Sequence, residues 1–422
     1  HNTGPGIGGG GWAPTRLLHK THGGNAKKII IEESDVTAFA GKRGGGAGIG
    51  TGLNCDVNEI AITKSNIIAK APANGEEGGA GIGSGRAGSV GTIKITNCPS
   101  VESVGGPHSA GIGCGGHHTL VTTILTTKCG PIVLTANNPD YKVKAFGGNK
   151  AAGIGTGLGG KFKGKTKDGN SIVIDGYSVD ASGGYGGAGI GGGANGSGGR
   201  GADSNSILIK GKGVINANGG EGAAGIGGGN GGNIIKKGKI NIQCKQDKPM
   251  EIVARGGTNS AGIGGGKDQS SCEIVIKGHP RKRELLKIRA FASSAGNRIN
   301  DAAAIGSGQD DAGNITIKDA TVYADAPYAG ADIGSGSIKG RPGKIHSITI
   351  DNSTIAARGS NKIAAGIGAG HGGSIDRIKI SNSTYKGNSI GTSIYSSPAF
   401  NYRAHRINDM KEITIENSKI EC

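Results

Sequence analysis

The sequence is poor in the residues that usually build globular cores and membrane spans. Aromatic residues make up 3% of the 422-residue chain, and there is one tryptophan. No run of 18 apolar residues occurs, so no membrane-spanning helix is expected. Apolar residues amount to 34%, which is low for one large globular core but sufficient for a thin fold filled with Ile, Val and Ala.

Cysteine is also scarce, and its spacing excludes the common metal and redox sites. None of the seven cysteines forms a Cys-x-x-Cys pair, so neither a zinc site nor a redox site is expected. Cys98 and Cys129 each follow an expected strand and lie 31 residues apart, about one repeat, which predicts a disulfide between adjacent layers. The odd number leaves at least one thiol unpaired within the chain, and Cys422 is a candidate.

Glycine is abundant, with 88 residues, but it lacks the every-third spacing that a collagen helix requires. Glycine-rich disorder is the simplest alternative. We reject it because paired isoleucines recur throughout the chain, and disorder would not preserve them.

A repeated phrase, Ala-Gly-Ile-Gly, is the main feature of the sequence. It surrounds Ile49, Ile82, Ile112, Ile154, Ile190, Ile226, Ile263 and Ile367, and variants surround Ile7, Ile305, Ile333 and Ile390. Successive isoleucines of this set are 23 to 42 residues apart. Such a period indicates a stack of one supersecondary unit, in which each copy buries its apolar face on its neighbours.

Each repeat also contains an Ile-x-Ile pair, a second pair of the form Val/Ile-x-Ala, and then the phrase. Five residues separate the two pairs, as in Ile31 to Val36 and Ile415 to Ile420. Alternation at period two predicts strands, and Asp, Asn, Ser or Gly between the pairs predicts a corner. The short unit between Ile305 and Ile333 has room for three strands and none for a helix.

The predicted fold is therefore all-β: a single right-handed parallel β-helix of about twelve coils, with three short strands per coil. We expect regular repeats over residues 1–384. Residues 385–422 are expected to form a degenerate last coil with an irregular insert and terminal strands. The chain begins with His1, so we expect a mature or trimmed product.

The phrase resembles the Gly-Ala-Gly-Ile-Gly-Gly repeats of large secreted or surface-anchored proteins of bacteria and some protists. The resemblance covers nearly the whole chain. It implies a β-solenoid of the adhesin-like or carbohydrate-associated kind, and it brings no catalytic residues.

The glycines of the phrase are the predicted assembly site. On a strand, Ala47 and Ile49 share one face, whereas Gly48 and Gly50 share the other. If Ile points inward, stacked coils present a flat strip of bare backbone to a second solenoid or an extended polymer. The alternative is that these glycines adopt positive φ at a tight corner. The predicted strip consists of Gly48, Gly50, Gly81, Gly83, Gly111, Gly113, Gly153, Gly155, Gly189, Gly191, Gly225, Gly227, Gly262, Gly264, Gly366 and Gly368.

The net charge of +17 and the pI near 9.5 favour an anionic partner, and an anionic polysaccharide is expected. Nucleic acid is not, because aromatic residues are few and no binding module is visible. The alternative interpretation is a solvated face that prevents edge-to-edge aggregation. One cluster, residues 161–167, overlaps a literal P-loop pattern at 159–166, but no helix is expected after it, so no cofactor is predicted.

A polysaccharide-cleaving β-helix enzyme is the main rival class. Asp310-Asp311, Gly370-His371-Gly372 and Arg377 resemble fragments of pectin-cleaving hydrolases, but His371 and Arg377 are only six residues apart. His117-His118 beside Cys114 is expected to be a solvent loop rather than a metal site. The sequons at Asn195, Asn314, Asn352 and Asn382 fit glycosylation of a secreted protein.

The ends suggest self-assembly. The chain opens on an expected third strand at Ile7 and closes after a first and a second strand at Ile415 and Ile420, so two copies placed head to tail would complete a coil. The alternative is that the chain is a slice of a longer solenoid. We therefore expect a non-enzymatic, extracellular or cell-surface structural protein. It would be an adhesin or filament former whose partner is itself, head to tail or laterally. The alternative is a protein that binds or cleaves an anionic polysaccharide.

Overall fold

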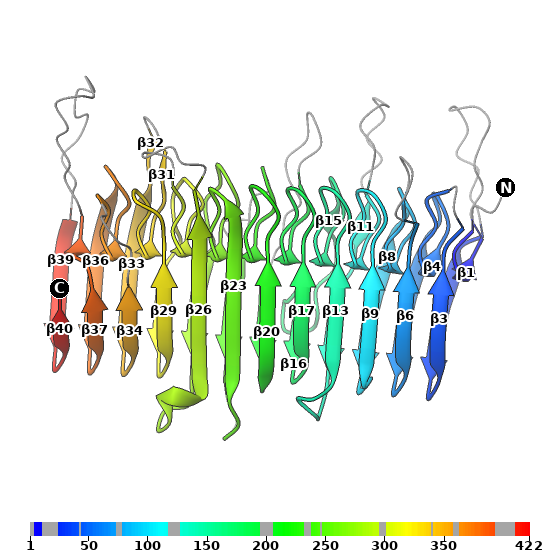
Figure 1. Ribbon diagram of the computed structural model, residues 1–422, viewed down its shortest axis with the longest axis horizontal. Coiled ribbons are helices and arrows are strands. Elements are labelled where there is room, and N and C mark those ends of the chain that lie inside the picture. Colours follow the sequence, from blue (N-terminus) through cyan, green and yellow to red (C-terminus); the bar gives the residue numbers. More distant parts are fainter. Residues whose placement is uncertain are drawn as a thin grey trace.

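Each repeat forms one coil of a right-handed parallel β-helix, as the sequence predicts (Figure 1). The computed structural model describes residues 4–10, 24–41, 44–72, 78–116, 127–194, 206–231, 238–244, 247–294, 301–338, 341–357, 363–392 and 410–422. Within these residues, the strands form three long parallel sheets, here called A, B and C, which run the length of the rod.

Sheet A contains the Ile-Gly strands of the repeated phrase. They are β1 (Ile7–Gly9), β4 (Ile49–Thr51), β7 (Ile82–Gly83), β10 (Ile112–Gly113), β14 (Ile154–Gly155), β18 (Ile190–Gly191), β21 (Ile226–Gly227), β24 (Ile263–Gly264), β27 (Ile305–Gly306), β30 (Ile333–Gly334), β35 (Ile367–Gly368) and β38 (Ile390–Gly391).

Sheet B contains the first Ile-x-Ile pair of each repeat. Its strands are β2 (Ala26–Glu32), β5 (Val57–Thr63), β8 (Val90–Thr96), β11 (Lys128–Cys129), β12 (Ile132–Thr135), β15 (Lys161–Phe162), β16 (Ile172–Asp175), β19 (Ser206–Lys210), β22 (Lys239–Gln243), β25 (Glu273–Lys277), β28 (Ile315–Lys318), β33 (Lys344–Asp351), β36 (Ser374–Ser381) and β39 (Met410–Glu416).

Sheet C contains the second pair and faces the viewer in Figure 1. Its strands are β3 (Asp35–Phe39), β6 (Asn66–Lys70), β9 (Ser100–Val104), β13 (Lys142–Phe146), β17 (Ser178–Ser182), β20 (Gly213–Asn218), β23 (Met250–Thr258), β26 (Leu286–Ser293), β29 (Thr321–Asp325), β34 (Thr354–Ala357), β37 (Thr384–Gly387) and β40 (Lys419–Glu421). A short hairpin of β31 (Ser337–Ile338) and β32 (Arg341–Pro342) and one 3₁₀ turn, η1 (Arg283–Leu285), complete the described elements.

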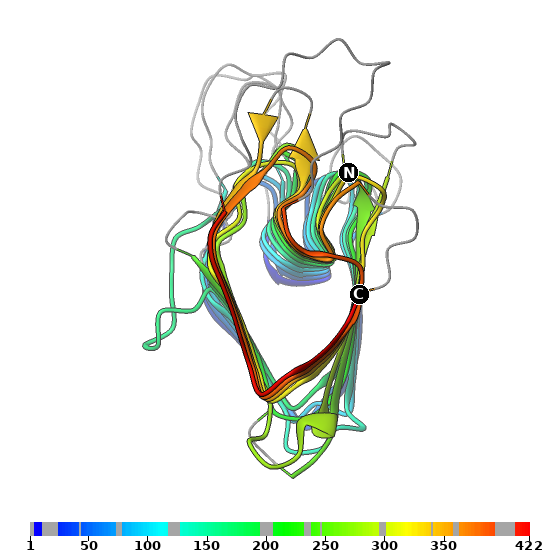
Figure 2. The same ribbon diagram turned by 90° about the vertical axis from the view of Figure 1, so that its left-hand side faces the viewer.

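Viewed along the rod, sheets B and C are two straight walls that meet at a sharp corner (Figure 2). Inward and outward side chains alternate along both walls, as in Asn66–Lys70, where Ile67 and Ala69 are buried. The isoleucines of sheet A stack in register, so that Ile82 lies between Ile49 and Ile112, and all three are fully buried. Burial of these aliphatic columns, at about 25 cal/mol per Å² of apolar surface, is the main stabilising contribution.

In the first two and the last three coils, a ladder of serine hydroxyls holds the corner between sheets B and C. Ser353 Oγ donates to Asp351 O in its own coil (2.8 Å) and accepts a hydrogen bond from Ala320 N–H of the preceding coil (3.2 Å). The ladder continues when Ser353 N–H donates to Ser383 Oγ (3.0 Å). The residue before each serine has positive φ, as at Asn352, which makes the sharp turn possible.

The repeated phrase folds inward rather than outward, so the predicted assembly strip is wrong. All sixteen glycines from Gly48 to Gly368 in that set are buried. The segment is a five-residue reversal, closed for example by Ala47 N–H donating to Thr51 O (2.9 Å). Figure 2 shows this segment bending toward the interior between the open ends of sheets B and C.

Close backbone packing explains why the phrase needs glycine at both positions. The second glycine has positive φ, +145° at Gly155, and a Cβ there would lie 1.9 Å from Gly191 O of the next coil. The first glycine lies against sheet C: a Cβ on Gly48 would be 2.7 Å from Lys70 N. The positive-φ alternative therefore holds for the second glycine, and no side chain of either could reach the surface.

The expected boundary between residues 384 and 385 falls inside β37. After it, β38, β39 and β40 pair with β35, β36 and β37, respectively, and so continue all three sheets.

We predict that Gly155→Ala severely destabilises the solenoid, by more than about 4 kcal/mol, because its Cβ meets a backbone oxygen that cannot move alone. Gly159→Ala is the matched control: Gly159 also has positive φ (+65°), but no atom lies within 4 Å of its Cβ position. This control should cost only about 1–2 kcal/mol. Urea unfolding followed by circular dichroism measures both, and equal effects of the two substitutions would contradict the packing described.

Candidate functional site

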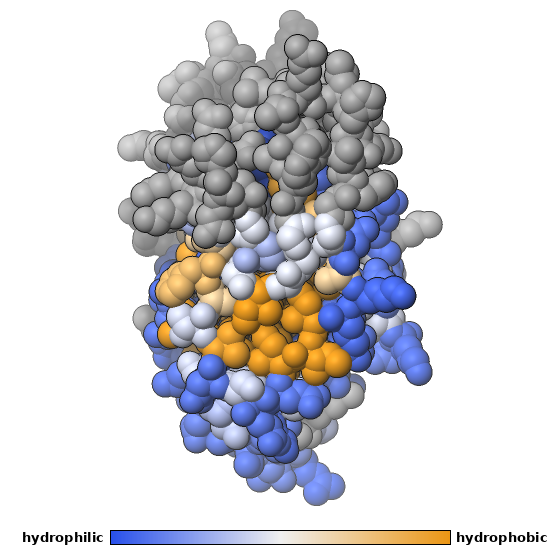
Figure 3. Space-filling model, turned by 90° about the vertical axis from the view of Figure 1, so that its right-hand side faces the viewer, coloured by the Kyte–Doolittle hydropathy of each residue, from blue (hydrophilic) through white to orange (hydrophobic). Residues whose placement is uncertain are grey.

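The two ends of the solenoid are the most unusual surfaces of the described chain. At one end β1, β2 and β3, and at the other β38, β39 and β40, pair on one side only. Figure 3 views the first end and shows an apolar area bordered by hydrophilic side chains. At the opposite end, Met410 and Ile415 are 42% and 45% exposed, although the equivalent residues of inner coils are buried.

The two ends present equivalent rows of inward side chains and of corner hydrogen-bonding groups. In sheet B the inward apolar positions are Ala26, Ile29 and Ile31 in β2, and Met410, Ile413 and Ile415 in β39. At the corner, Ser383 N–H donates to Ser418 Oγ (3.1 Å), and no described residue accepts from Ser418 N–H. Ser34 Oγ donates to Glu32 O (2.6 Å), and among the described residues no backbone N–H donates to it.

Along the outer faces, many charged side chains pair with side chains of the neighbouring coil. Glu59 accepts ion pairs from Lys28 (3.7 Å) and Lys94 (3.1 Å), and its hydrogen bond with Lys94 contributes most to lowering the pKa of its carboxyl group. Arg377 likewise pairs with Glu412 (2.9 Å). Such exposed pairs contribute at most about 1 kcal/mol each. They keep the register of adjacent coils and support the solvated-face interpretation of the charge.

The cysteine prediction is wrong. All seven cysteines are free thiols, and Cys98 and Cys129 lie in different parts of the coil. Cys98 occupies the serine position of the corner, where its N–H donates to the Tyr177 hydroxyl (2.7 Å). Cys129 lies in β11, where its thiol contacts that of Cys114, and burial raises the pKa of Cys129 well above its usual value.

The predicted glycosylation sites differ in their surroundings. Asn314 is exposed. Asn352 and Asn382 are corner residues with positive φ, and their Nδ2 atoms, where a glycan would be attached, donate to Asp319 Oδ1 (2.6 Å) and Asp351 Oδ1 (3.0 Å), respectively. Asn195 lies outside the described residues, as do His117 and His118.

The enzyme-like fragments have structural partners. Asp310 Oδ2 accepts from Ser270 Oγ (3.1 Å), and Asp311 Oδ1 accepts from Lys344 N–H (2.9 Å). The literal P-loop pattern contains β15, and the next described element is the strand β16 rather than a helix. Within the described ranges, no group of His, Cys, Asp and Glu could hold a metal ion, and no helix could span a membrane.

Two features of the structure were not predicted from the sequence. One is the contact between Cys114 and Cys129. The other is a cationic hollow lined by Lys128 and Lys163. The signal for the hollow is the spacing of Lys128 and Lys161, 33 residues or about one repeat, which places them side by side in register. Comparison of the chain with protein-family models, curated proteins and solved structures finds no match.

We predict that one thiol per chain reacts rapidly with Ellman's reagent in the native protein and that seven react after denaturation. Cys422 is exposed, whereas the other six are at most 1% exposed, and burial also raises the pKa of Cys272 to about 12. Cys422→Ser should abolish the rapid reaction of this one thiol. Five thiols in the denatured, unreduced protein would instead reveal a disulfide.

Proposed function

We propose that this chain is a non-enzymatic structural β-solenoid that assembles head to tail into filaments at a cell surface or in the extracellular space. The observation that supports assembly is the match between the two ends. When β39 of one copy is placed before β2 of the next in the register of inner coils, Met410 faces Ala26, and Ile413 faces Ile29. In the same register β40 precedes β3, so that Ile420 faces Val36.

The charged groups at the ends are complementary only in part in this arrangement. Glu412 would face Lys28, and Lys419 would face Asp35, whereas Glu416 would face Glu32, and Lys411 would face Lys27. Ser418 N–H would donate to Ser34 Oγ and continue the corner ladder. A heterologous contact of this kind does not close, so repeated addition gives an open filament.

The surface location and the adhesin-like character are supported by the resemblance of the repeated phrase to those of secreted and surface-anchored proteins. With the glycine strip buried, the proposal retains assembly through the coil ends only.

We predict that the protein forms rods whose mean length increases with concentration, and that Ile415→Lys keeps it as single rods. The substitution places a charge in an apolar joint, where it would be desolvated without a partner. Val214→Lys is the matched control, because Val214 is 43% exposed on the outer side of β20, in the middle of the rod. Negative-stain microscopy and sedimentation velocity measure the lengths. Wild-type protein that stays monomeric at every concentration would refute head-to-tail assembly.

The proposal that the chain is not an enzyme is tested with a polysaccharide substrate. We predict no release of reducing sugar from polygalacturonate, because Asp310 and Asp311 accept hydrogen bonds from Ser270 and Lys344 of the neighbouring coils. A glycosidase needs two carboxyl groups that face the scissile bond. Release that is lost in Asp310→Asn or Asp311→Asn would show that the chain is an enzyme.

A further inference from the structure

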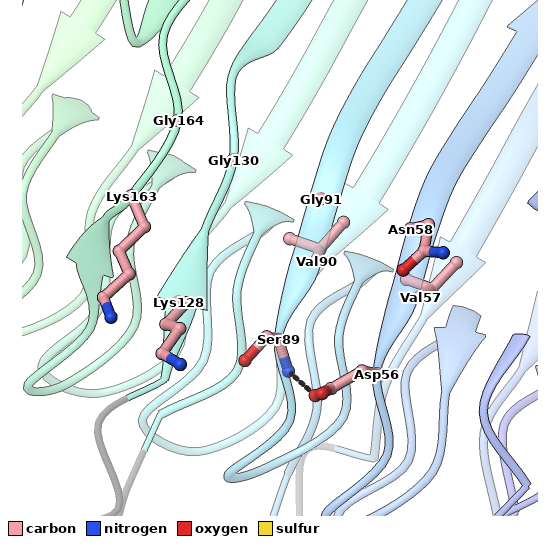
Figure 4. Close-up of a pocket in the computed structure, with 10 residues that line it drawn as sticks. All are labelled: Asp56, Val57, Asn58, Ser89, Val90, Gly91, Lys128, Gly130, Lys163 and Gly164. Atoms are coloured by element: carbon pink, nitrogen blue, oxygen red, sulfur yellow. Dashed lines mark hydrogen bonds between the residues drawn. The ribbon is translucent and has the colours of Figure 1, made fainter. Parts of the chain in front are cut away.

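A hollow of about 230 Å³ lies on the outer face of sheet B, across the coils of β5, β8, β11 and β15 (Figure 4). Its rim carries Asn58, Ser89, Lys128 and Lys163, and Figure 4 shows both lysine side chains along the same side. Asp56 forms the far edge, where its Oδ1 accepts a hydrogen bond from Ser89 N–H (2.8 Å).

The hollow exists because side chains are missing from one row of the sheet. Four buried residues that point inward lie side by side in register: Val57, Val90, Cys129 and Phe162. The residue that follows each of them points outward, and these residues form a row of Asn58, Gly91, Gly130 and Lys163. The two glycines in the middle cannot be replaced, because a Cβ on Gly130 would overlap the Gly91 carbonyl group. The floor is therefore bare backbone, flanked by an amide on one side and an ammonium group on the other.

Three lysines cluster at this hollow. Lys128 and Lys161 occupy paired positions on β11 and β15, and Lys163 follows two residues later on the same face. Among the described residues, none of the three forms an ion pair with an acidic side chain. The positive charge of Lys128, with a smaller contribution from Lys161, lowers the pKa of Lys163. The positive charge of the three lysines is thus concentrated on one side of the hollow, whereas the one acidic residue of its lining, Asp56, lies at the far edge.

A second hollow on the same face provides a contrast. It is larger, about 370 Å³, and it also contains two lysines, Lys210 and Lys239. Those lysines form ion pairs with Asp175 (3.2 Å) and Glu273 (3.0 Å), so their charges are already compensated. Of these two hollows, the first combines open space with lysines that have no acidic partner among the described residues.

We propose that the first hollow binds one acidic sugar unit of a polysaccharide, with Lys128 and Lys163 on its carboxylate or sulfate group and Asn58 and Ser89 on its hydroxyl groups. The hollow is large enough for one sugar ring, and its polar donors surround a flat floor. None of its lining residues is aromatic, so the base stacking that single-stranded nucleic acids use has no platform here. The proposal does not depend on filament formation.

The test is calorimetric titration, at constant physiological ionic strength, with a galacturonate hexamer, a sulfated dextran oligomer, a neutral maltohexaose and a single-stranded oligothymidylate. We expect at least one of the two acidic sugars to bind and the neutral sugar not to bind. Lys128→Gln/Lys163→Gln should weaken that binding roughly tenfold or more, because two charge-assisted hydrogen bonds are lost. Preference for the hexamer or for the sulfated oligomer identifies the acidic group as carboxylate or sulfate.

Two further variants distinguish a built site from general attraction. Lys142→Gln/Lys144→Gln also removes two positive charges, but from the outer face of β13, and it should change binding less than twofold. Ser89→Glu should weaken binding because the new carboxylate can pair with Lys128, as Glu59 pairs with Lys94. Equal losses in the two double variants, no binding of either acidic sugar, or tighter binding of oligothymidylate would each overturn the proposal.

Discussion

The fold depends on one constraint: the backbones of successive coils must approach closely where sheet A folds into the interior. At each coil a glycine Cα lies directly against the carbonyl oxygen of the next coil, as Gly83 lies against Gly113 O, where a Cβ would be 1.6 Å away. The inward bend brings the isoleucine of every phrase into the space between sheets B and C. Without it the two walls would enclose a void that Ile and Ala side chains could not fill.

This constraint also explains the polar ladders. The inward bend buries backbone N–H groups that water cannot reach, so each needs a partner. The residue after the phrase often supplies one: Thr156 Oγ1 accepts from Gly193 N–H (2.9 Å), and Ser335 Oγ accepts from Gly370 N–H (3.0 Å). At the corner the same role falls to serine in the last coils, where Ser353 N–H donates to Ser383 Oγ and Ser383 N–H donates to Ser418 Oγ.

The sequence was sufficient to predict the number of strands per coil, the stacking of Ile49 on Ile82 and the corner between Ile31 and Val36. These features follow from alternation and spacing along a single segment. Whether the glycines of the Ala-Gly-Ile-Gly phrase face the interior or the solvent could not be predicted in the same way. A strand of alternating Gly and Ile is compatible with either an exposed or a buried glycine face. What decides between them is the distance between Gly48 and Lys70, which belongs to tertiary packing.

The variable length of the inserts between strands explains why the Cys98–Cys129 disulfide was predicted wrongly and the lysine cluster was not predicted. Cys98 and Cys129 are about one repeat apart in the sequence, but Cys129 lies in the additional short strand β11, which precedes β12 in sheet B. This strand places Cys129 beside Cys114 and Lys128 beside Lys161. The cationic hollow arises from the same short strands, because its lining comes from four coils that the linear sequence separates.

Amide hydrogen exchange tests the buried phrase most directly. Ile154 N–H donates to Gly189 O (3.0 Å) and Thr156 N–H to Gly191 O (3.2 Å), both in the interior, whereas the turn at residues 167–170 is largely solvent-accessible. Peptides that cover residues 152–156 should therefore be among the slowest to exchange. Exchange of these amides at the rate of the 167–170 turn would show that the phrase lies at the surface and would contradict the account.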